Sequence, residues 1–192
     1  MARSRYHALP PDLPVPVDDG AADHLPGMCL PAIALASTRG GSVDVAAAAA
    51  KARTLVLYVY PRTGTPGEPS PDGWDAIPGA RGCTPQSCAF RDHHAELRTL
   101  GADVLGLSAQ PTAEQAAFAA REHLPFALLS DPALELAEAL GLPTFEAGGM
   151  RLCKRITLVV EDAAIAKAFY PVFPPDRNAA GVIAWLRERR RP

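Results

Sequence analysis

The sequence predicts an α/β fold in which helices flank a central mixed β-sheet, and three observations support this prediction. Continuous apolar runs of strand length occur at residues 54–60, 103–108 and 156–160, as in strands that are buried on both faces. Helical segments with clear start and stop signals separate or follow these runs. Finally, a chain of 192 residues with 48% apolar content can form one well-packed domain.

The first part of the chain has a different composition from the rest. Residues 1–28 are rich in proline and aspartate and show no helical or strand periodicity, so we expect an extended N-terminal arm. The domain itself is expected to cover residues 29–192. It opens with two short apolar segments, 30–36 and 42–45, on either side of Gly40-Gly41, and this pattern predicts a small β-hairpin.

A long loop is predicted after the first buried strand. Residues 66–82 contain four prolines and four glycines in seventeen positions, a composition that does not support a regular element. Long ordered loops beside a reactive group often act as lids, although a tolerated insertion explains the composition equally well. We expect its largest apolar side chain, Trp74, to be partly buried.

A helix is predicted to start beside a cysteine at the end of this loop. Thr84 is a suitable N-cap, Pro85 suits the first helical position, and Gly101 can end the helix. Cys83 would then lie at the helix N-terminus, where unpaired N–H groups and the helix dipole favour a thiolate. The sequence therefore predicts that Cys83 is a nucleophile.

A second cysteine, Cys88, follows five residues later in the same helix. Five residues of an intact helix advance the chain by about 7.5 Å and turn it by roughly 140°. Cys83 and Cys88 would therefore lie beyond disulfide reach unless the first turn unwinds. This spacing favours a transient disulfide over a resting structural one.

The remaining helices have recognisable ends. Thr112 is a predicted N-cap with Gln115 at the capping-box position, and a further helix is predicted to start at Asp131-Pro132 and to end at Gly141. The residues between these helices, 126–130, are a weaker strand candidate. A last helix is predicted to begin near Asp176 and to bury Val182, Trp185 and Leu186.

Charge and cysteine content argue against several classes of function. A net charge of −2 and a pI near 6.2 argue against a nucleic-acid partner. No apolar run reaches membrane-spanning length and residues 1–12 lack the apolar core of a secretory signal, so we expect a cytoplasmic protein without a membrane partner. In that compartment Cys29 and Cys153, isolated in the sequence, are expected to be small buried residues.

Several segments together resemble a known family, the peroxiredoxins of the Q or bacterioferritin-comigratory type. The resemblance extends from about Leu30 to Leu186. It is carried by Tyr58-Val59-Tyr60-Pro61, Thr65-Pro66-Gly67, Gly82-Cys83-Thr84, Cys88-Ala89-Phe90-Arg91-Asp92 and the strand from Arg155 to Val160.

The resemblance implies a thioredoxin-like fold and a thiol peroxidase that reduces hydrogen peroxide or organic hydroperoxides without a metal, flavin or haem. It implies a thioredoxin-like dithiol as reductant and a monomer rather than a dimer. Carried over residue by residue, Cys83 matches the peroxidatic cysteine and Cys88 the resolving cysteine. Thr65, Pro61 and Arg155 match the active-site threonine, proline and arginine.

The chain departs from the family pattern in one respect. The family places its cysteine three residues after the threonine, whereas Cys83 follows Thr65 by eighteen residues. If the additional residues loop out, Thr65 can still reach the Cys83 sulfur. Otherwise Thr84 or backbone groups must take its place.

Two alternatives stay open on the sequence alone. One is a one-cysteine peroxidase, in which an external thiol reduces oxidised Cys83 and Cys88 belongs to the core. The other is a metal-binding thioredoxin-fold module, because Cys83, Cys88, His93 and His94 are ligand types clustered within twelve residues. An intact helix disfavours the module, since it would hold His94 about 16 Å from Cys83 along its axis.

Overall fold

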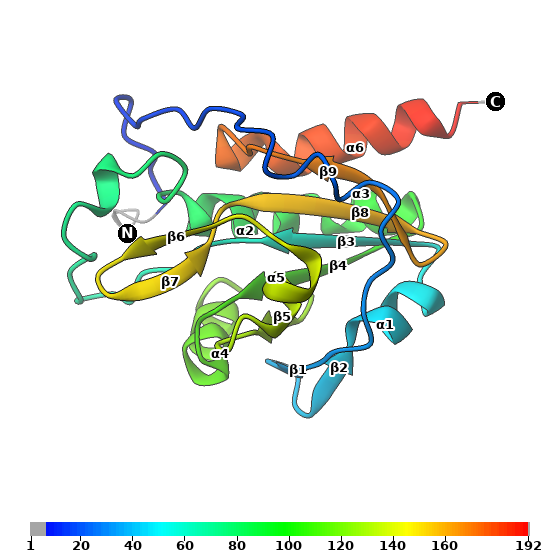
Figure 1. Ribbon diagram of the computed structural model, residues 1–192, viewed down its shortest axis with the longest axis horizontal. Coiled ribbons are helices and arrows are strands. Elements are labelled where there is room, and N and C mark those ends of the chain that lie inside the picture. The colour runs from blue at the N-terminus through cyan, green and yellow to red at the C-terminus, as the bar shows by residue number, and fades with distance from the viewer. Residues whose placement is uncertain (1–6, 192) are drawn as a thin grey trace.

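The computed structural model describes residues 7–191 and contains a seven-stranded mixed sheet with strand order β2-β1-β5-β4-β3-β8-β9 (Figure 1). β4 runs parallel to both β3 and β5, while β8 is antiparallel to β3 and β9. A separate two-stranded hairpin, β6-β7, stands beside this sheet. The strands are β1 (Ala34–Ser37), β2 (Ser42–Asp44), β3 (Thr54–Val59), β4 (Ala102–Ser108), β5 (Leu128–Ser130), β6 (Thr144–Ala147), β7 (Met150–Cys153), β8 (Ile156–Glu161) and β9 (Ala164–Phe169).

The helices cover both faces of the sheet. They are α1 (Val45–Lys51), α2 (Cys83–Asp92), α3 (His94–Thr99), α4 (Thr112–Arg121), α5 (Glu135–Leu140) and α6 (Asn178–Arg189), with short 3₁₀ helices at Trp74–Ala76 and Pro175–Arg177. Apolar residues of α1 and α5 pack on one face, and those of α2, α3, α4 and α6 pack on the other. None of the helices within residues 7–191 is long and apolar enough to cross a membrane.

Strand β3 shows how the sequence builds both cores. All six of its residues are buried, as the continuous apolar run predicts. Because successive side chains of a strand point to opposite faces, Leu55 and Leu57 join the core under α1 and α5. Val56 and Tyr58 join the core under α2 and α6. The predicted α/β fold and its central mixed sheet are confirmed.

The predicted strands and the N-terminal hairpin are present, but three other strands were not expected. The pattern of β6, β7 and β9 is weak because these strands are only partly buried and carry charged residues such as Glu146, Arg151 and Lys167. The hairpin β6-β7 packs against the loop before Cys83, and β9 forms an edge of the main sheet.

The predicted start of the cysteine helix is wrong by two residues. Gly82, with φ of 104°, is the N-cap, so Cys83 itself is the first helical residue and Pro85 the third. Proline is tolerated there because the first-turn N–H groups have no intrahelical partner. The helix also does not continue to Gly101. It ends at Asp92 with His93 as its C-cap, and a second helix, α3, begins at His94.

The predicted capping box at the start of α4 is wrong as well. Pro111 is the N-cap and Thr112 the first helical residue. The side chain of Gln115 turns into the core instead, where its Oε1 accepts a hydrogen bond from the Tyr60 hydroxyl at 2.6 Å. The start of α5 also lies later than the predicted Asp131-Pro132, because the helix begins at Glu135 with Leu134 as its N-cap, whereas Gly141 ends it as predicted. The Asp131 carboxylate still accepts hydrogen bonds from three backbone N–H groups in the first turn of α5.

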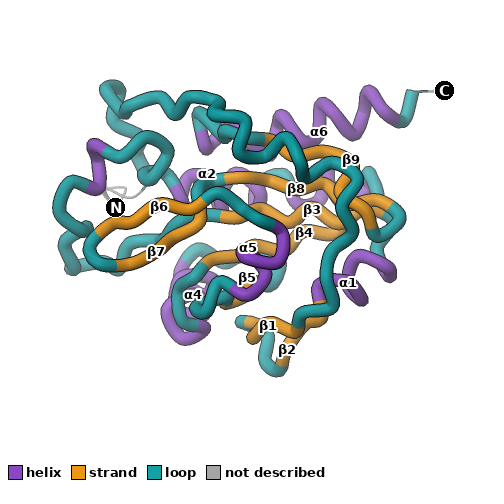
Figure 2. The backbone as a smooth tube through the Cα atoms, viewed as in Figure 1, coloured by secondary structure: helices purple, strands orange, loops and turns teal. Residues whose placement is uncertain are grey.

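Residues 7–28, the described part of the predicted N-terminal arm, lie against the domain as an irregular segment, drawn as a long loop in Figure 2; residues 1–6 lie outside the described residues. Its backbone pairs with the start of β9, where Gly27 donates to Ile165 and Ile165 donates to Met28. Leu25 is fully buried in the core under α1 and α5. Trp185 of α6, expected to be buried, is only partly so, whereas Val182 and Leu186 are buried.

Candidate active site

The sulfur of Cys83 lies at the N-terminus of α2, and the residue is only 3% exposed. The backbone forms this helix start because Gly82 adopts a left-handed conformation that other residues rarely adopt. A side chain at position 82 would also collide with Pro175. Cys83 and Cys88 are both free thiols on one intact helix.

The side chain of Arg155 reaches this sulfur from the loop between β7 and β8. Its Nη2 lies 3.2 Å from Cys83 Sγ and also donates to the carbonyls of Gly79, Ala80 and Arg81 at 3.1 to 3.2 Å. The structure therefore brings together the cysteine and the arginine that the sequence singles out. The side chain of Arg81, two residues before Cys83, pairs with Asp75.

A buried network of side-chain hydrogen bonds holds Arg155 in this orientation. Its Nη1 donates to the side-chain oxygen of Gln86, and the Gln86 amide donates to Asn178 at 2.9 Å. Thr157 of β8 donates to the same Asn178 oxygen at 2.6 Å. Sequence reasoning did not identify these three residues, because they come from α2, β8 and α6 and only the fold brings them together.

Cys83 lines a small pocket of about 40 Å³, which offers room for a few water-sized molecules. Thr65 lines the same pocket, so residues 66–82 do loop out and leave Thr65 on the cysteine side. The loop itself forms part of the wall through Trp74, which is buried and packs against Phe145 of β6. The residues lining the pocket are Arg62, Thr63, Gly64, Thr65, Glu68, Pro69, Ser70, Pro71, Trp74, Arg81, Gly82, Cys83 and Thr84.

Pro61 directly precedes the residues that line this pocket but does not itself line it. It is buried, and its carbonyl accepts a hydrogen bond from the Ser108 hydroxyl at 2.9 Å. The next buried residue, Thr63, is fixed by Gln110, which accepts from its backbone N–H at 2.6 Å and from its hydroxyl at 3.1 Å. These contacts fix the course of the segment that carries Thr65.

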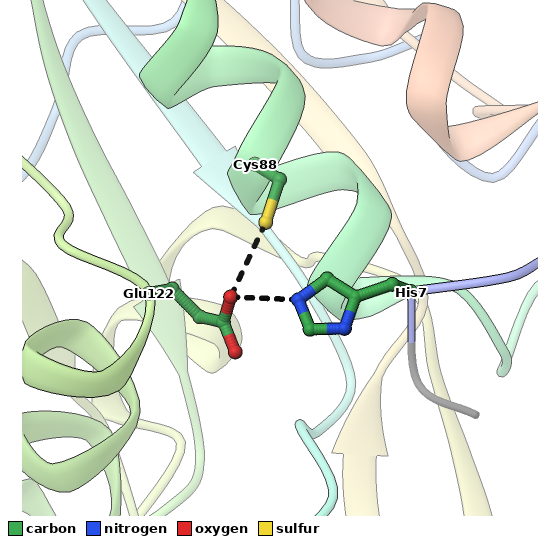
Figure 3. Close-up of side chains that lie close together, drawn as sticks. All are labelled: His7, Cys88 and Glu122. Atoms are coloured by element: carbon green, nitrogen blue, oxygen red, sulfur yellow. Dashed lines mark hydrogen bonds and ion pairs between the residues drawn. The ribbon is translucent and has the colours of Figure 1, made fainter. Parts of the chain in front are cut away.

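Cys88 lies in a second polar cluster, shown in Figure 3. Its thiol donates to Glu122 Oε2 at 3.6 Å, and His7 Nε2 lies 2.8 Å from the same oxygen. Burial raises the pKa of the Cys88 thiol to about 11, and the charge of Glu122 adds to this rise while Arg91 opposes it. His7 and Glu122 are 115 residues apart in the sequence, so no local pattern could link them to Cys88.

The Glu122 carboxylate is held ionised. Burial alone would raise its pKa, but the hydrogen bonds and charges of His7 and Arg121 outweigh this effect and the pKa of Glu122 is lowered. Arg91 lies close as well, since its Nη1 donates to the backbone carbonyl of Glu122 at 2.7 Å and lies 4.0 Å from the carboxylate.

Within residues 7–191, His7, Cys88 and Glu122 are the one group whose ligand atoms gather closely enough for a metal ion, all within 4.8 Å of one another. The group shares only Cys88 with the ligand set considered from the sequence. Two guanidinium groups, of Arg91 and Arg121, already neutralise Glu122 and disfavour a further cation there. The arrangement is better explained as a Glu122 carboxylate that is paired with arginines and accepts a hydrogen bond from the Cys88 thiol.

Comparison with known proteins agrees with the fold. The family model described as Redoxin matches residues 25–183, and the chain therefore belongs to the redoxin family. Within it, the chain is similar to peroxiredoxin Q of Triticum aestivum chloroplasts, with 33% identity over 129 residues, 67% of this chain and 52% of that protein. It is also similar to chloroplastic peroxiredoxin Q of Arabidopsis thaliana, with 32% identity over 133 residues, 69% of this chain and 54% of that protein. The chain thus spans about half the length of these relatives.

Solved structures confirm the thioredoxin-like peroxiredoxin fold. Peroxidoxin BcpB of Mycobacterium tuberculosis superimposes with a TM-score of 0.70 at 26% identity, over 86% of this chain and 98% of that one. Peroxiredoxin Q of Xanthomonas campestris gives a TM-score of 0.65 over 92% of this chain and 98% of that one, and at 21% identity it supports the fold alone. The resemblance to the Q type is confirmed.

Proposed function

We propose that this chain is a thiol peroxidase that reduces hydrogen peroxide and organic hydroperoxides through Cys83. The observation that carries the proposal is the 3.2 Å contact between the Arg155 guanidinium and the Cys83 sulfur. Within the described residues Arg155 pairs with no carboxylate, although it is only 3% exposed. A buried cation is costly unless it is paired, and a Cys83 thiolate supplies the missing anion.

The first step is an attack of the Cys83 thiolate on the terminal peroxide oxygen. The sulfur–oxygen bond forms as the oxygen–oxygen bond breaks, the leaving oxygen takes a proton, and Cys83 becomes a sulfenic acid. Arg155 is placed to stabilise the negative charge as it moves from sulfur to oxygen. Thr65, on the wall of the same pocket, is proposed to orient the peroxide by a hydrogen bond.

The second step joins the two cysteines. Cys88 attacks the Cys83 sulfenic acid, a disulfide forms, and the hydroxyl leaves with the Cys88 proton as water. Since α2 is intact with both thiols free, this step requires local unwinding of its first turns. A thioredoxin-like dithiol then restores both thiols by exchange. A cytoplasmic location and a monomeric state remain predictions.

Substitution of each cysteine tests the proposal. Cys83→Ser removes the nucleophile and should abolish peroxide consumption, while Cys88→Ser should permit one turnover and block recycling by thioredoxin. Cys153→Ser is a matched control, because Cys153 is buried on the other face of the sheet. Full activity of Cys83→Ser contradicts the proposal. Continued recycling of Cys88→Ser by thioredoxin favours the one-cysteine alternative.

A further inference from the structure

The two cysteines of α2 lie in opposite electrostatic surroundings. Cys83 contacts the guanidinium of Arg155, whereas Cys88 contacts the ionised carboxylate of Glu122 (Figure 3). A cation beside a sulfur favours the thiolate, and an anion that accepts an S–H hydrogen bond favours the thiol. The fold thus places two thiols, five residues apart, beside groups of opposite charge.

We propose that Glu122, held in place by His7, is a positioning residue that keeps Cys88 a neutral thiol while α2 is folded and frees it only when α2 unwinds. This inference rests on the proposed resolving role of Cys88. It assigns to the N-terminal arm, through His7, a part in the order of the two chemical steps.

The geometry supports this assignment. Cys88 is 8% exposed and Glu122 is 6% exposed, so water screens their interaction poorly. Both carboxylate oxygens of Glu122 have partners, since Oε2 lies 2.8 Å from His7 and 4.0 Å from Arg91 and Oε1 lies 3.3 Å from Arg121. The carboxylate therefore cannot easily turn away from the thiol. The titratable or charged side chains around Cys88 are Arg91 and Asp92 of α2, Glu122 with His7 and Arg121, and the Tyr58 hydroxyl of β3.

Unwinding of α2 reverses the effect. Once Cys88 leaves its buried site beside Glu122 and enters water, its pKa falls from about 11 toward the ordinary value of 9.0. At neutral pH this raises the thiolate fraction about 100-fold. Of the two cysteines of α2, only Cys83 therefore meets peroxide in a reactive form while the helix is folded, and Cys88 gains reactivity in the unwound conformation.

The test measures the pH dependence of Cys88 alkylation by iodoacetamide in the Cys83→Ser protein, with EDTA present and the modified peptides resolved by mass spectrometry. The parent should show a midpoint near pH 11, because burial and Glu122 both raise the pKa of Cys88. Glu122→Gln should move this midpoint to lower pH and so speed labelling at pH 8 several-fold, on the order of the effect of one removed charge. His7→Ala removes the hydrogen bond to Glu122 and should move the midpoint part of the way to lower pH. His7→Gln keeps an N–H donor for Glu122 and should leave the midpoint unchanged.

The matched control is Glu96→Gln, which removes the carboxylate of another histidine pair, His93 with Glu96 at 3.2 Å. It should leave the Cys88 midpoint unchanged. If Glu122 has only a structural role, Glu122→Gln will speed labelling equally at every pH and leave the midpoint in place, and the proposal is then wrong. A parent midpoint near 9 overturns it too. A separate measurement tests the resolving role of Cys88. If thioredoxin still recycles the Cys88→Ser protein, Cys88 is not the resolving cysteine.

Discussion

Arg155 is the residue on which the proposed reactivity of Cys83 depends most. Its guanidinium meets the sulfur, three backbone carbonyls and the Gln86 side chain simultaneously. A planar group with several N–H donors can satisfy all of these partners, whereas a lysine ammonium is a single point charge that cannot. The orientation of this one side chain therefore links the loops around Cys83 to the chemistry at its sulfur.

Arg155→Lys should consequently reduce the second-order rate constant for peroxide consumption by roughly 100-fold, the size of effect seen when one oriented donor is removed from an active site. Competition with a peroxidase of known rate measures this constant. Arg151→Lys is the control, because Arg151 is exposed and pairs with Glu138. A loss of less than threefold in Arg155→Lys would show that the guanidinium is not needed.

At the scale of elements, helix α2 has to be stable in one state and able to open in another. Its start depends on Gly82, whose φ of 104° and close approach to Pro175 exclude a side chain. Its interior is held by Phe90, which is fully buried and stacks on Tyr58 at a centroid distance of 4.6 Å. The first turns, which carry both cysteines, are thus anchored at Gly82 and at Phe90.

Gly82→Ala should destabilise the protein, because the new methyl group is strained and also clashes with Pro175. Gly40→Ala provides the control, since Gly40 has φ of 89° but open space around it. We expect Gly82→Ala to lower the free energy of unfolding by at least about 1 kcal/mol more than Gly40→Ala does. Urea denaturation measures both. Equal losses would mean that Pro175 moves aside at no cost.

At the scale of the molecule, the N-terminal arm is tied to distant parts of the domain. His7 pairs with Glu122, and Asp19 accepts hydrogen bonds from Lys154 at 2.7 Å and from the Tyr170 hydroxyl at 2.8 Å. His24 lies 2.9 Å from the carbonyl of Leu140. The arm is therefore part of the folded structure, and its attachment and the surroundings of Cys88 are physically connected.

Asp19→Asn should loosen the arm. The hydrogen bonds from Lys154 and Tyr170 lower the pKa of Asp19 to about 2, so the attached state binds fewer protons than the detached one. The stabilisation is present above about pH 4 and is lost as the pH falls toward 2. In Asp19→Asn, amide exchange around Gly27 at pH 7 should be several-fold faster, as in a segment of lower local stability.

Asp23→Asn is the control for this experiment, because Asp23 is an exposed residue of the same arm. Amide hydrogen exchange followed by mass spectrometry compares the two variants. Equal exchange around Gly27 in both variants would show that the ion pair of Asp19 with Lys154 does not hold the arm.

The sequence predicted those features that depend on local pattern. The buried strand β3, the cysteine at a helix start and the hairpin before α1 follow from apolar periodicity and turn residues, and they are present. Arg155 and Thr65 came from the resemblance, and the fold places both near Cys83. Two other features depend on contacts between distant segments. They are the hydrogen-bond network through Gln86 and Asn178 and the cluster of His7 with Glu122. Such contacts have no local pattern, so the sequence could not reveal them.

The most direct test of the central claim is the mass of the reduced protein after one equivalent of hydrogen peroxide, with peptide mapping of the product. The account predicts the loss of two hydrogens and a disulfide that joins Cys83 to Cys88. An unmodified protein, or oxidation at Cys29 or Cys153 while Cys83 stays reduced, would contradict it.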